Sequence, residues 1–271
     1  IVSRLEAIEE IAGMDILCSD KTGTLTLNQL TLGAPISFGQ VEPETVVQMA
    51  ALASKDAEED PIDKAVMAGV SDPQVLKSYQ VTKFLPFDPV IKRTEATISD
   101  PSGHTFRVSK GAPQVILALD KNQDKVAAHV ERTINEFAKR GYRALGVART
   151  DDRDQWQFLG ILPLFDPPRP DSTLVIEDLS RLGVKVKMLT GDQVAIAKET
   201  CRQLGLGTHI LDAQLLEQAN PHQQGRLADT VMEADGFGQV FPEHKYHIVD
   251  VLQQRGHIVG MTGDGVNDAP A

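Results

Sequence analysis

Apolar and polar positions follow one pattern at the two ends of the chain and another in its middle. Short apolar runs at Met14–Ser19, Val184–Leu189 and His257–Met261 are each followed by polar residues, and segments such as Gln193–Leu204 show helical periodicity. Short apolar strands that alternate with helices are typical of a parallel sheet with crossover helices. We therefore predict an α/β fold for the two ends of the chain.

The middle of the chain predicts an α+β domain with an antiparallel sheet, inserted into the α/β domain. Its strands have hairpin spacing around Asp100–Gly103, and a long amphipathic helix ends at Gly141. The expected helices are Thr45–Ala53, Ile62–Val70 and a segment through Val126–Phe137, and the expected strands are Val81–Phe87, Thr94–Ser99, Thr105–Ser109, Arg143–Arg149 and Trp156–Leu162. We therefore predict two domains: residues 1–32 and 164–271 form the α/β domain, and residues 33–163 form the inserted domain.

Two connections must join these domains, Leu27–Pro35 and Leu164–Pro170. The second contains Pro167, Pro168 and Pro170, and each proline fixes its own φ and restrains its neighbour. In the simpler interpretation, these connections only mark the boundary between two domains. In the functional interpretation, they also form a partly rigid hinge that lets the inserted domain deliver a ligand.

Composition narrows the classes of protein to consider. The 271 residues carry a net charge of −11, which argues against nucleic acid or anionic membrane surfaces as partners. No run of about 18 apolar residues is present, so we expect no membrane insertion by this segment. Cys18 and Cys201 each lie within a periodic element, which indicates reduced core thiols rather than a disulfide.

The heptapeptide D-K-T-G-T-L-T at Asp20–Thr26 is the most specific candidate for chemistry. It places a carboxylate directly after an apolar strand, and Gly23 permits a tight turn whose N–H groups can hold an anion. An aspartate in this setting can attack phosphorus and become a phosphoaspartate. The simpler interpretation is an ordinary glycine-containing turn with a polar cap.

Two further strands end in polar residues of the same kind. Thr190-Gly191-Asp192 follows one, and Thr262-Gly263-Asp264-Gly265-Val266-Asn267-Asp268 follows the other. Because ligands bind at the carboxyl edge of open α/β sheets, we expect these segments to converge with Asp20. Thr190 and Gly191 could hold a phosphoryl oxygen, whereas Asp192 could instead cap the helix that follows it.

The acidic residues predict a Mg²⁺ site, since Mg²⁺ takes hard oxygen ligands and bridges carboxylate to phosphate. The expected ligands are Asp20 and Asp264, with the Thr22 carbonyl and Asp268 in or near the coordination shell. Lys245 in F-P-E-H-K-Y could neutralise a transferring phosphoryl group, although a lone helical lysine is usually only solvated.

These motifs, in this order, resemble the phosphorylation domain of P-type cation-transporting ATPases, which belong to the haloacid dehalogenase superfamily. The resemblance covers essentially the whole chain. It implies a Rossmann-like phosphorylation domain, interrupted by an antiparallel nucleotide-binding domain, in which ATP phosphorylates Asp20. It also implies phosphate or Mg²⁺ contacts from Lys21, Thr22, Thr190, Gly191, Asp192, Lys245 and Asn267, with Asp264 as metal ligand and Asp268 supporting it.

The inserted domain resembles the part of these pumps that holds ATP. An aromatic ring can stack on adenine, and basic side chains can meet phosphate. Without the resemblance, a phenylalanine in a strand more often belongs to the hydrophobic core, and a lysine is more often a solvated surface residue. For the acidic pair Glu58 and Glu59, a solvated loop is as good an interpretation as a contact with the nucleotide. The candidate nucleotide contacts are Phe87 and Asp88 in P-F-D-P, Lys92, Lys110 and Gly111 in S-K-G-A-P, Arg143, and Glu59.

One position separates a pump from a soluble phosphatase with a large cap, which is the main alternative. Those phosphatases usually carry a second aspartate two residues after the nucleophile, and here that residue is Thr22. Without an acid/base group at that place, hydrolysis of the phosphoaspartate should be slow, as suits a coupled machine. A nucleotide-binding module without catalysis is the third hypothesis.

Three motifs, D-P-P-R, F-P-E-H-K-Y and P-F-D-P-V-I-K-R-T, look like the proton-exporting branch of the plasma membrane. A pump for another cation stays an alternative, since the residues that select the ion lie in membrane helices. The resemblance implies partner membrane and actuator domains in the same polypeptide, a place on the cytoplasmic face of the plasma membrane, and further elements after Ala271. We expect the segment itself to be soluble and unable to transport.

Overall fold

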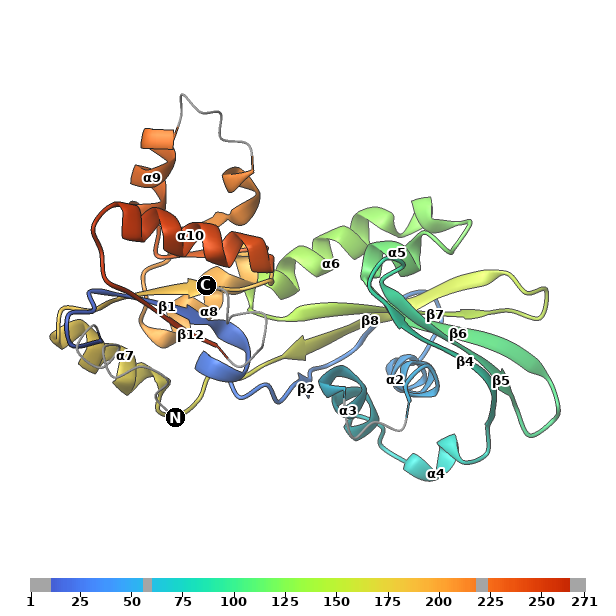
Figure 1. Ribbon diagram of the computed structural model, residues 1–271. Coiled ribbons are helices and arrows are strands. Elements are labelled where there is room, and N and C mark those ends of the chain that lie inside the picture. The colour runs from blue at the N-terminus through green and yellow to red at the C-terminus, as the bar shows by residue number, and fades with distance from the viewer. Residues whose placement is uncertain (1–10, 56–59, 218–223, 264–271) are drawn as a thin grey trace. The chain divides into compact units, whose positions relative to one another are not determined.

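Two β-sheets, one parallel and one antiparallel, organise the chain in the computed structural model (Figure 1). The structure describes residues 11–55, 60–217 and 224–263. Its contacts divide the chain into two compact units, residues 1–28 with 166–271 and residues 29–165. The predicted fold class, an α/β region interrupted by an α+β region, is confirmed.

The first unit is built on a five-stranded parallel sheet with the order β10-β11-β9-β1-β12. Strand β1 lies between β9 and β12, so the earliest strand occupies the interior of the sheet. The strands are Ile16–Asp20 (β1), Lys185–Leu189 (β9), Ile210–Asp212 (β10), Gly236–Gly238 (β11) and Val259–Thr262 (β12).

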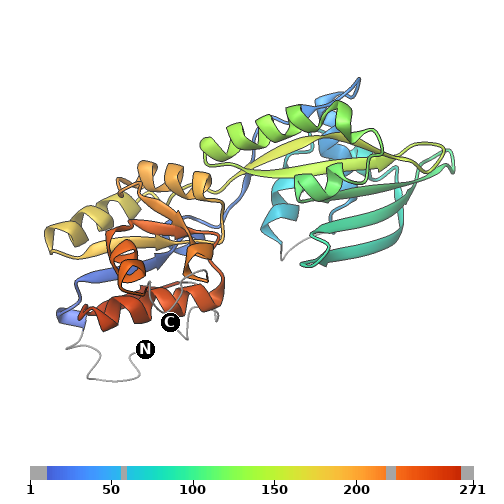
Figure 2. The same ribbon diagram turned by 90° about the horizontal axis from the view of Figure 1, so that it is seen from above.

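Helices cover both faces of this sheet, as its buried strands require. On one face α7 (Ser172–Arg181) and α8 (Val194–Leu204) pack through Ile176, Ala197 and Cys201. On the other, α9 (Gln224–Glu233) and α10 (Pro242–Gln254) pack on β1 and β11. Figure 2 shows α10 across the sheet from α7 and α8. A short helical turn, Ala213–Leu216, follows β10.

The second unit is built on an antiparallel sheet with the order β2-β8-β7-β6-β5-β4, in which β3 also pairs with β8. The predicted hairpin is confirmed, since β5 and β6 pair from Arg93–Gly111 to Ser99–Thr105. The strands are Thr31–Leu32 (β2), Ile36–Ser37 (β3), Gln80–Asp88 (β4), Arg93–Ser99 (β5), Thr105–Gly111 (β6), Arg143–Thr150 (β7) and Trp156–Phe165 (β8).

Helices flank this sheet on both faces (Figure 1). One core joins α2 (Pro43–Leu52) and α3 (Pro61–Ala68) to the sheet, and the other joins α5 (Pro113–Leu117) and α6 (Ala127–Lys139) to β7 and β8. A single turn of helix, α4 (Pro73–Leu76), precedes β4, and Gln123–Lys125 forms a short turn before α6. Each unit therefore has hydrophobic cores of its own.

The second unit extends a few residues beyond the boundaries predicted at 33 and 163. Thr31 pairs with Phe165 and Leu32 with Leu164 in an antiparallel ladder. Because β2 and the end of β8 bond to each other, residues 29–165 form the contact unit. The ladder was not visible in the sequence, since a two-residue strand carries no periodicity.

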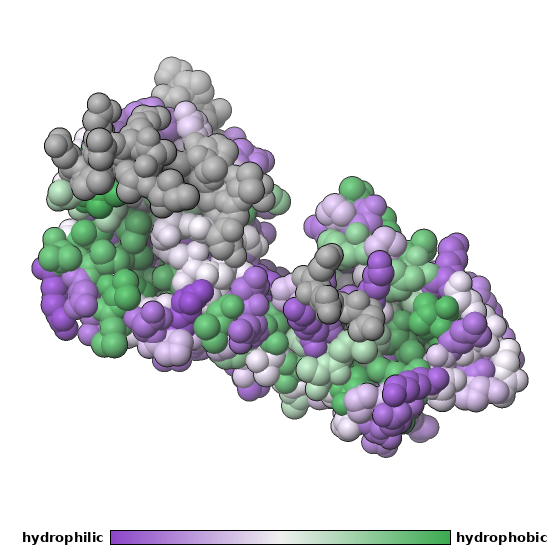
Figure 3. All heavy atoms as spheres, turned by 60° about the horizontal axis from the view of Figure 1, so that its bottom comes forward, coloured by the Kyte–Doolittle hydropathy of each residue, from purple (hydrophilic) through white to green (hydrophobic). Residues whose placement is uncertain are grey.

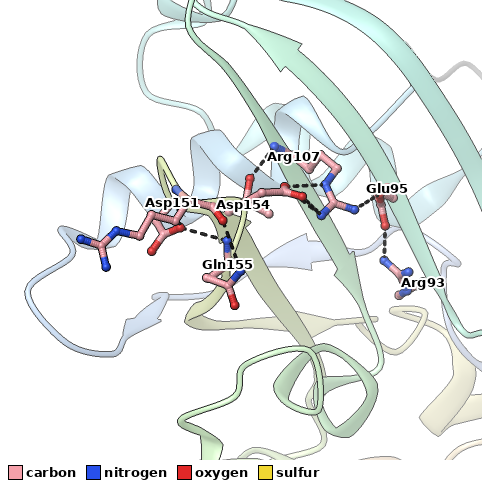
Figure 4. Close-up of polar contacts among 8 residues, drawn as sticks. Arg93, Glu95, Arg107, Asp151, Asp154 and Gln155 are labelled. Atoms are coloured by element: carbon pink, nitrogen blue, oxygen red, sulfur yellow. Dashed lines mark hydrogen bonds and ion pairs between the residues drawn. The ribbon is translucent and has the colours of Figure 1, made fainter.

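A network of ion pairs links β5, β6 and the turn between β7 and β8 in the second unit (Figure 4). Arg107 contacts Asp154 at 2.8 Å and Glu95 at 3.3 Å, and Glu95 also contacts Arg93 at 2.5 Å. The Arg107 guanidinium lies over the ring of Trp156, 4.9 Å from its centroid. Partly exposed pairs of this kind contribute up to about 1 kcal/mol each, so the network orients β5, β6 and the β7–β8 hairpin more than it stabilises them.

The surface mixes apolar and charged side chains rather than segregating them. Exposed apolar residues lie on several elements, among them Val81 and Phe87 on β4 and Leu174 on α7, and Figure 3 shows hydrophobic and hydrophilic surface interleaved on one face. Within the described residues, no helix is both long enough and apolar enough to cross a membrane. Cys18 and Cys201 are buried free thiols, as predicted.

Candidate functional site

Asp20 is the last residue of β1, at the carboxyl edge of the parallel sheet. It is in register with Leu189 of β9, and Ser19 is in register with Thr262 of β12. Since these strands are parallel neighbours, the segments beginning at Thr190 and Thr262 leave the sheet on either side of Asp20. The expected convergence of three strand ends is therefore observed. Asp264, Asn267 and Asp268 lie outside the described residues.

The turn after Asp20 depends on glycine. Gly23 has φ of 75°, a region that side-chain-bearing residues rarely adopt. The turn is closed by the Thr26 amide, which donates to the Lys21 carbonyl at 3.0 Å, and the Thr26 hydroxyl oxygen lies 3.0 Å from the same carbonyl oxygen. Thr22 and Thr24 are half-buried. Backbone N–H groups in such a turn can hold an anion beside Asp20.

Lys245 on α10 reaches Asp20. Its Nζ lies 3.0 Å from Asp20 Oδ1, and the side chains are only 11% and 14% exposed. Because both side chains are largely shielded from water, the attraction between the lysine and the carboxylate is stronger than at an exposed site. A carboxylate paired with a cation at a strand end can approach phosphorus while the cation offsets charge on the phosphoryl group.

Lys21 does not face solvent. It is 2% exposed, and its Nζ contacts Asp192 Oδ2 at 3.0 Å and Asp166 Oδ2 at 3.5 Å. The resemblance implies a phosphate contact for Lys21, whereas the structure shows it neutralising two buried carboxylates beneath the loop. The cap residue of α8 is Gln193, so Asp192 lies one residue before the cap. Its carboxylate joins the T-G-D loop to the D-K-T-G-T turn.

Asp166 was not expected to be part of this cluster. Its Oδ2 accepts a hydrogen bond of 2.6 Å from Thr26, and the following segment contacts the same turn through Arg169, whose Nη2 donates to the Gly23 carbonyl at 3.2 Å. Asp166 Oδ1 is buried and has no hydrogen-bond partner among the described residues. The D-P-P-R segment, which the sequence marked as a connection and as a motif of the pump branch, therefore also contacts the turn that follows the candidate nucleophile.

The T-G-D loop is held by backbone bonds to the segment after β11. Val240 N–H donates to the Thr190 carbonyl at 3.0 Å and Gln239 N–H to the Asp192 carbonyl at 2.8 Å. Thr190 is 2% exposed, and its hydroxyl accepts from the Asp192 amide. Gly191 is exposed, so its amide is the accessible donor of this loop.

The donor chemistry at this edge fits Mg²⁺. The described part of the site offers the Asp20 carboxylate and the Thr22 backbone carbonyl, both hard oxygen donors. Among the described residues, no group of three or more His, Cys, Asp or Glu could hold a metal ion. The other two expected ligands, Asp264 and Asp268, fall outside that part of the chain. Cys18 is no rival nucleophile, because burial raises the pKa of its thiol to about 12.

The second unit contains a cavity of about 410 Å³ that gathers most of the predicted nucleotide contacts. Phe87, Lys92, Lys110, Gly111 and Arg143 all line it, together with apolar side chains such as Leu145 and Leu164. An apolar cavity with a few converging cations has the character of a cofactor pocket. Glu59 lies outside the described residues, as does Glu58.

Asp88 does not line this cavity. Its Oδ1 accepts hydrogen bonds from the amides of Val90 and Ile91, at 2.7 and 3.1 Å, so it closes the turn between β4 and β5. This turn also sets the positions of Phe87 and Lys92, which flank it. The register of β4 shifts between Leu85 and Asp88, and Lys92 has φ of 52°. Such an irregularity re-aims side chains at the edge of a sheet, here Phe87 and Lys92.

Gly111 is required by this close packing. A Cβ at this position would lie 2.3 Å from the Lys92 carbonyl oxygen and 2.7 Å from Arg93 Cα, both backbone atoms that cannot swing aside. Glycine at this position therefore allows the end of β6 to pair closely with the start of β5, beside the turn that carries Lys92.

Asp63 on α3 was missed by the sequence reasoning. Its Oδ1 forms a short ion pair with Lys110, and its Oδ2 accepts from the Lys55 amide. Asp63 and Lys110 are 6% and 4% exposed. A carboxylate within the amphipathic segment Ile62–Val70 gives no local signal, because its partner is 47 residues away. The buried pair holds Lys110 in place within the cavity wall.

Comparison with known proteins agrees with this geometry. A family model described as haloacid dehalogenase-like hydrolase matches residues 14–271. The chain belongs to this family. The resemblance to cation-transporting ATPases is confirmed by relatives from an archaeon and from yeasts.

The chain is 51% identical over 277 residues to a protein of Methanocaldococcus jannaschii that carries the name of a cation-transporting ATPase. It is 46% identical over 283 residues to the plasma membrane ATPase of Kluyveromyces lactis and to plasma membrane ATPase 1 of Saccharomyces cerevisiae. Each match covers 100% of this chain but only 34%, 32% and 31% of the respective relative. The chain thus spans about a third of the length of these relatives.

Proposed function

We propose that this chain is the ATP-binding and autophosphorylating region of a P-type cation-transporting ATPase. The observation that carries the proposal is Asp20, which ends the interior strand β1 with Lys245 3.0 Å from its carboxylate and the T-G-D loop beside it. The names of the relatives and the replacement of the phosphatase aspartate by Thr22 favour a pump over a soluble phosphatase.

The proposed reaction is an in-line phosphoryl transfer. A carboxylate oxygen of Asp20 forms a bond to the γ-phosphorus of ATP, and the bond from that phosphorus to the bridging oxygen breaks, releasing ADP. Lys245 offsets charge on the equatorial oxygens, and Thr190 and the Gly191 amide donate hydrogen bonds to them. Asp20, the Thr22 carbonyl, Asp264 and Asp268 would hold Mg²⁺, which neutralises phosphate charge when bound.

The cavity of the second unit is proposed to bind the nucleotide. Phe87 stacks on the adenine, and Lys92, Lys110 and Arg143 meet the ring edge or phosphates. Glu59 would approach the adenine amino group and Asn267 the phosphate. A transfer to Asp20 then requires the second unit to deliver ATP, with residues 27–35 and 164–170 as the paired hinge.

The test is trapping of phosphate from γ-labelled ATP in the polypeptide that carries this chain. Acid-stable, hydroxylamine-sensitive label should appear in the parent protein and be absent in Asp20→Asn. Asp15→Asn, in the residue that precedes β1, should keep the label, because the Asp15 carboxylate contacts His257 and the Ile258 amide at the amino end of the strand, opposite to Asp20. Full labelling of Asp20→Asn would end this proposal.

The transported ion is proposed to be the proton, on the resemblance of D-P-P-R and F-P-E-H-K-Y to the proton-exporting branch. The parent protein would then supply membrane and actuator domains and hold this region at the cytoplasmic face of the plasma membrane. ATP-dependent acidification of vesicles that contain the parent protein, abolished by Asp20→Asn, is the expected result. Transport of another cation without acidification would leave the phosphorylation chemistry intact and overturn only the choice of ion.

A further inference from the structure

His244 occupies an unusual place at the start of α10. It is 3% exposed, immediately precedes Lys245, and is the third residue of the helix after Pro242. The cap residue of this helix is Phe241, whose side chain has no acceptor for the first amides. A buried imidazole therefore lies where a helix usually relies on a polar cap.

The contacts of His244 determine its tautomer. The Phe241 amide donates to Nδ1 at 3.2 Å, so Nδ1 cannot carry a proton. In the neutral ring the proton then lies on Nε2, which donates to Glu217 Oε1 at 2.9 Å. The arrangement is half of a capping box, in which histidine supplies the side-chain acceptor that Glu or Gln usually supplies, while Phe241 supplies none in return. His244 thus joins the start of α10 to the end of the Ala213–Leu216 turn.

The residues that His244 secures connect the T-G-D loop to Lys245. Gln239 and Val240 bond to the carbonyls of Asp192 and Thr190, and the next residue is Phe241. One helical turn later Lys245 reaches Asp20, its own amide bonded to the Phe241 carbonyl at 3.3 Å. The position of Lys245 therefore depends on how Phe241 is held.

We propose that His244, as the Nε2–H tautomer, is a positioning residue that caps α10 and thereby aims Lys245 at Asp20. The geometric part stands on the contacts above, and its consequence for phosphorylation rests on the proposed function. His244 touches no reacting atom and acts through Lys245.

The geometric part is tested on the 271-residue chain by ¹⁵N NMR. The imidazole resonances should show Nε2 protonated and Nδ1 unprotonated at neutral pH. The Lys245 ammonium resonance, assigned by its loss in Lys245→Met, should be protected from exchange in the unmodified chain and in His244→Asn, whose amide oxygen can replace Nδ1 as acceptor. It should lose that protection in His244→Leu. A protonated Nδ1, or an unchanged Lys245 resonance in His244→Leu, would overturn the proposal.

The functional part uses the phosphorylation rate of the parent protein. Loss of a helix cap costs about 1 kcal/mol, so His244→Leu should slow phosphorylation at least about fivefold, while His244→Asn stays within about twofold. The affinity for ATP should not change, because the nucleotide cavity belongs to the other unit. Equal impairment of the two variants, or weakened ATP binding in both, contradicts the positioning role. If the parent protein takes up no label at all, the proposed function fails, and the NMR experiment still decides the role of His244.

Discussion

The lysine of the D-K-T-G-T motif belongs to a buried ionic cluster. Lys21 is buried between Asp192 and Asp166, two carboxylates from segments far apart in the chain. Removing one partner from a buried ionic cluster leaves charge without compensation, which costs far more than loss of a surface pair. The residue next to the candidate nucleophile thus acts on the stability of the loop.

We expect Lys21→Met to lower the free energy of unfolding by about 3–5 kcal/mol, since two buried carboxylates lose their cation. Chemical denaturation of the chain measures this change. In the double variant Lys21→Met with Asp192→Asn the loss should be smaller, because one of the two carboxylates is neutral. A loss below about 1 kcal/mol in the single variant would mean that Lys21 behaves as a surface charge.

Arg143 begins β7 at the wall of the nucleotide cavity. A hydrogen bond to a charged group contributes about 1.5–3 kcal/mol, so Arg143→Ala should weaken ATP binding at least about tenfold. Titration calorimetry checks this value. Arg149→Ala is the matched control near the other end of the strand, where the guanidinium lies 5.1 Å from the Phe106 ring centroid. Equal affinities for Arg143→Ala and the unmodified chain would remove Arg143 from the proposed site.

At the scale of elements, strand β9 carries a fully buried lysine that its apolar pattern did not reveal. Lys187 is 0% exposed, and its Nζ donates to the carbonyls of Val231, Met232 and Ala234 at the end of α9. A lysine at the end of a helix satisfies its last carbonyls and its dipole. Burial, with a smaller effect of Lys185, lowers the pKa of Lys187 from 10.5 to about 8.

This pKa predicts how stability depends on pH. Between pH 8 and 10.5, the unfolded chain binds more protons at Lys187 than the folded chain does, so the free energy of unfolding rises with pH in this range. The cost of burying the charged lysine is therefore complete below pH 8 and decreases as the pH rises. Relative to Lys187→Met, the chain should gain about 1 kcal/mol in free energy of unfolding from pH 8 to pH 9. Chemical denaturation at both pH values measures this gain. As a control, the difference in free energy of unfolding between the chain and Lys198→Met, which removes an exposed lysine, should be the same at both pH values. A constant difference between the chain and Lys187→Met would contradict a lowered pKa.

At the scale of the whole molecule, the two units have separate hydrophobic cores, and the proposed function gives them separate chemical roles. The cores of the second unit are made of residues between Leu30 and Leu164, and those of the first unit lie between Ile16 and Met261 on the two outer segments. The cavity for the proposed nucleotide belongs to one unit and Asp20 to the other. Binding and phosphorylation should therefore be separable.

Residues 29–165 expressed alone should fold cooperatively and bind ATP with a dissociation constant within about threefold of that of the whole chain, a difference under about 1 kcal/mol. The reason is that β2 and β8 close this unit on itself. Calorimetry with the isolated segment tests this, with Arg143→Ala in the segment as control. A folded segment without ATP binding would show that the cavity needs residues of the other unit.

Much of this protein could be predicted from the sequence because neighbouring residues decide it. Gly23 and Gly205 both adopt positive φ, and the Asp100–Gly103 turn joins two strands of alternating pattern. Strand ends that carry Asp20, Thr190 and Thr262 meet because parallel strands share their carboxyl edge. Backbone sterics and the alternation of apolar and polar residues depend on nearby residues, so they can be predicted without knowledge of distant contacts.

The partners of the buried charges were decided only by the tertiary structure. The sequence does not show that Lys21, Lys110 and Lys187 are buried, and each is neutralised or hydrogen-bonded by segments many residues away. Which carboxylate or carbonyl meets a buried cation depends on how sheets and helices pack, since desolvation and pairing are properties of the folded interior. The chain alone thus determines where the candidate nucleophile Asp20 lies, and the packed interior determines which charged groups contact it and which contact the turn that follows it.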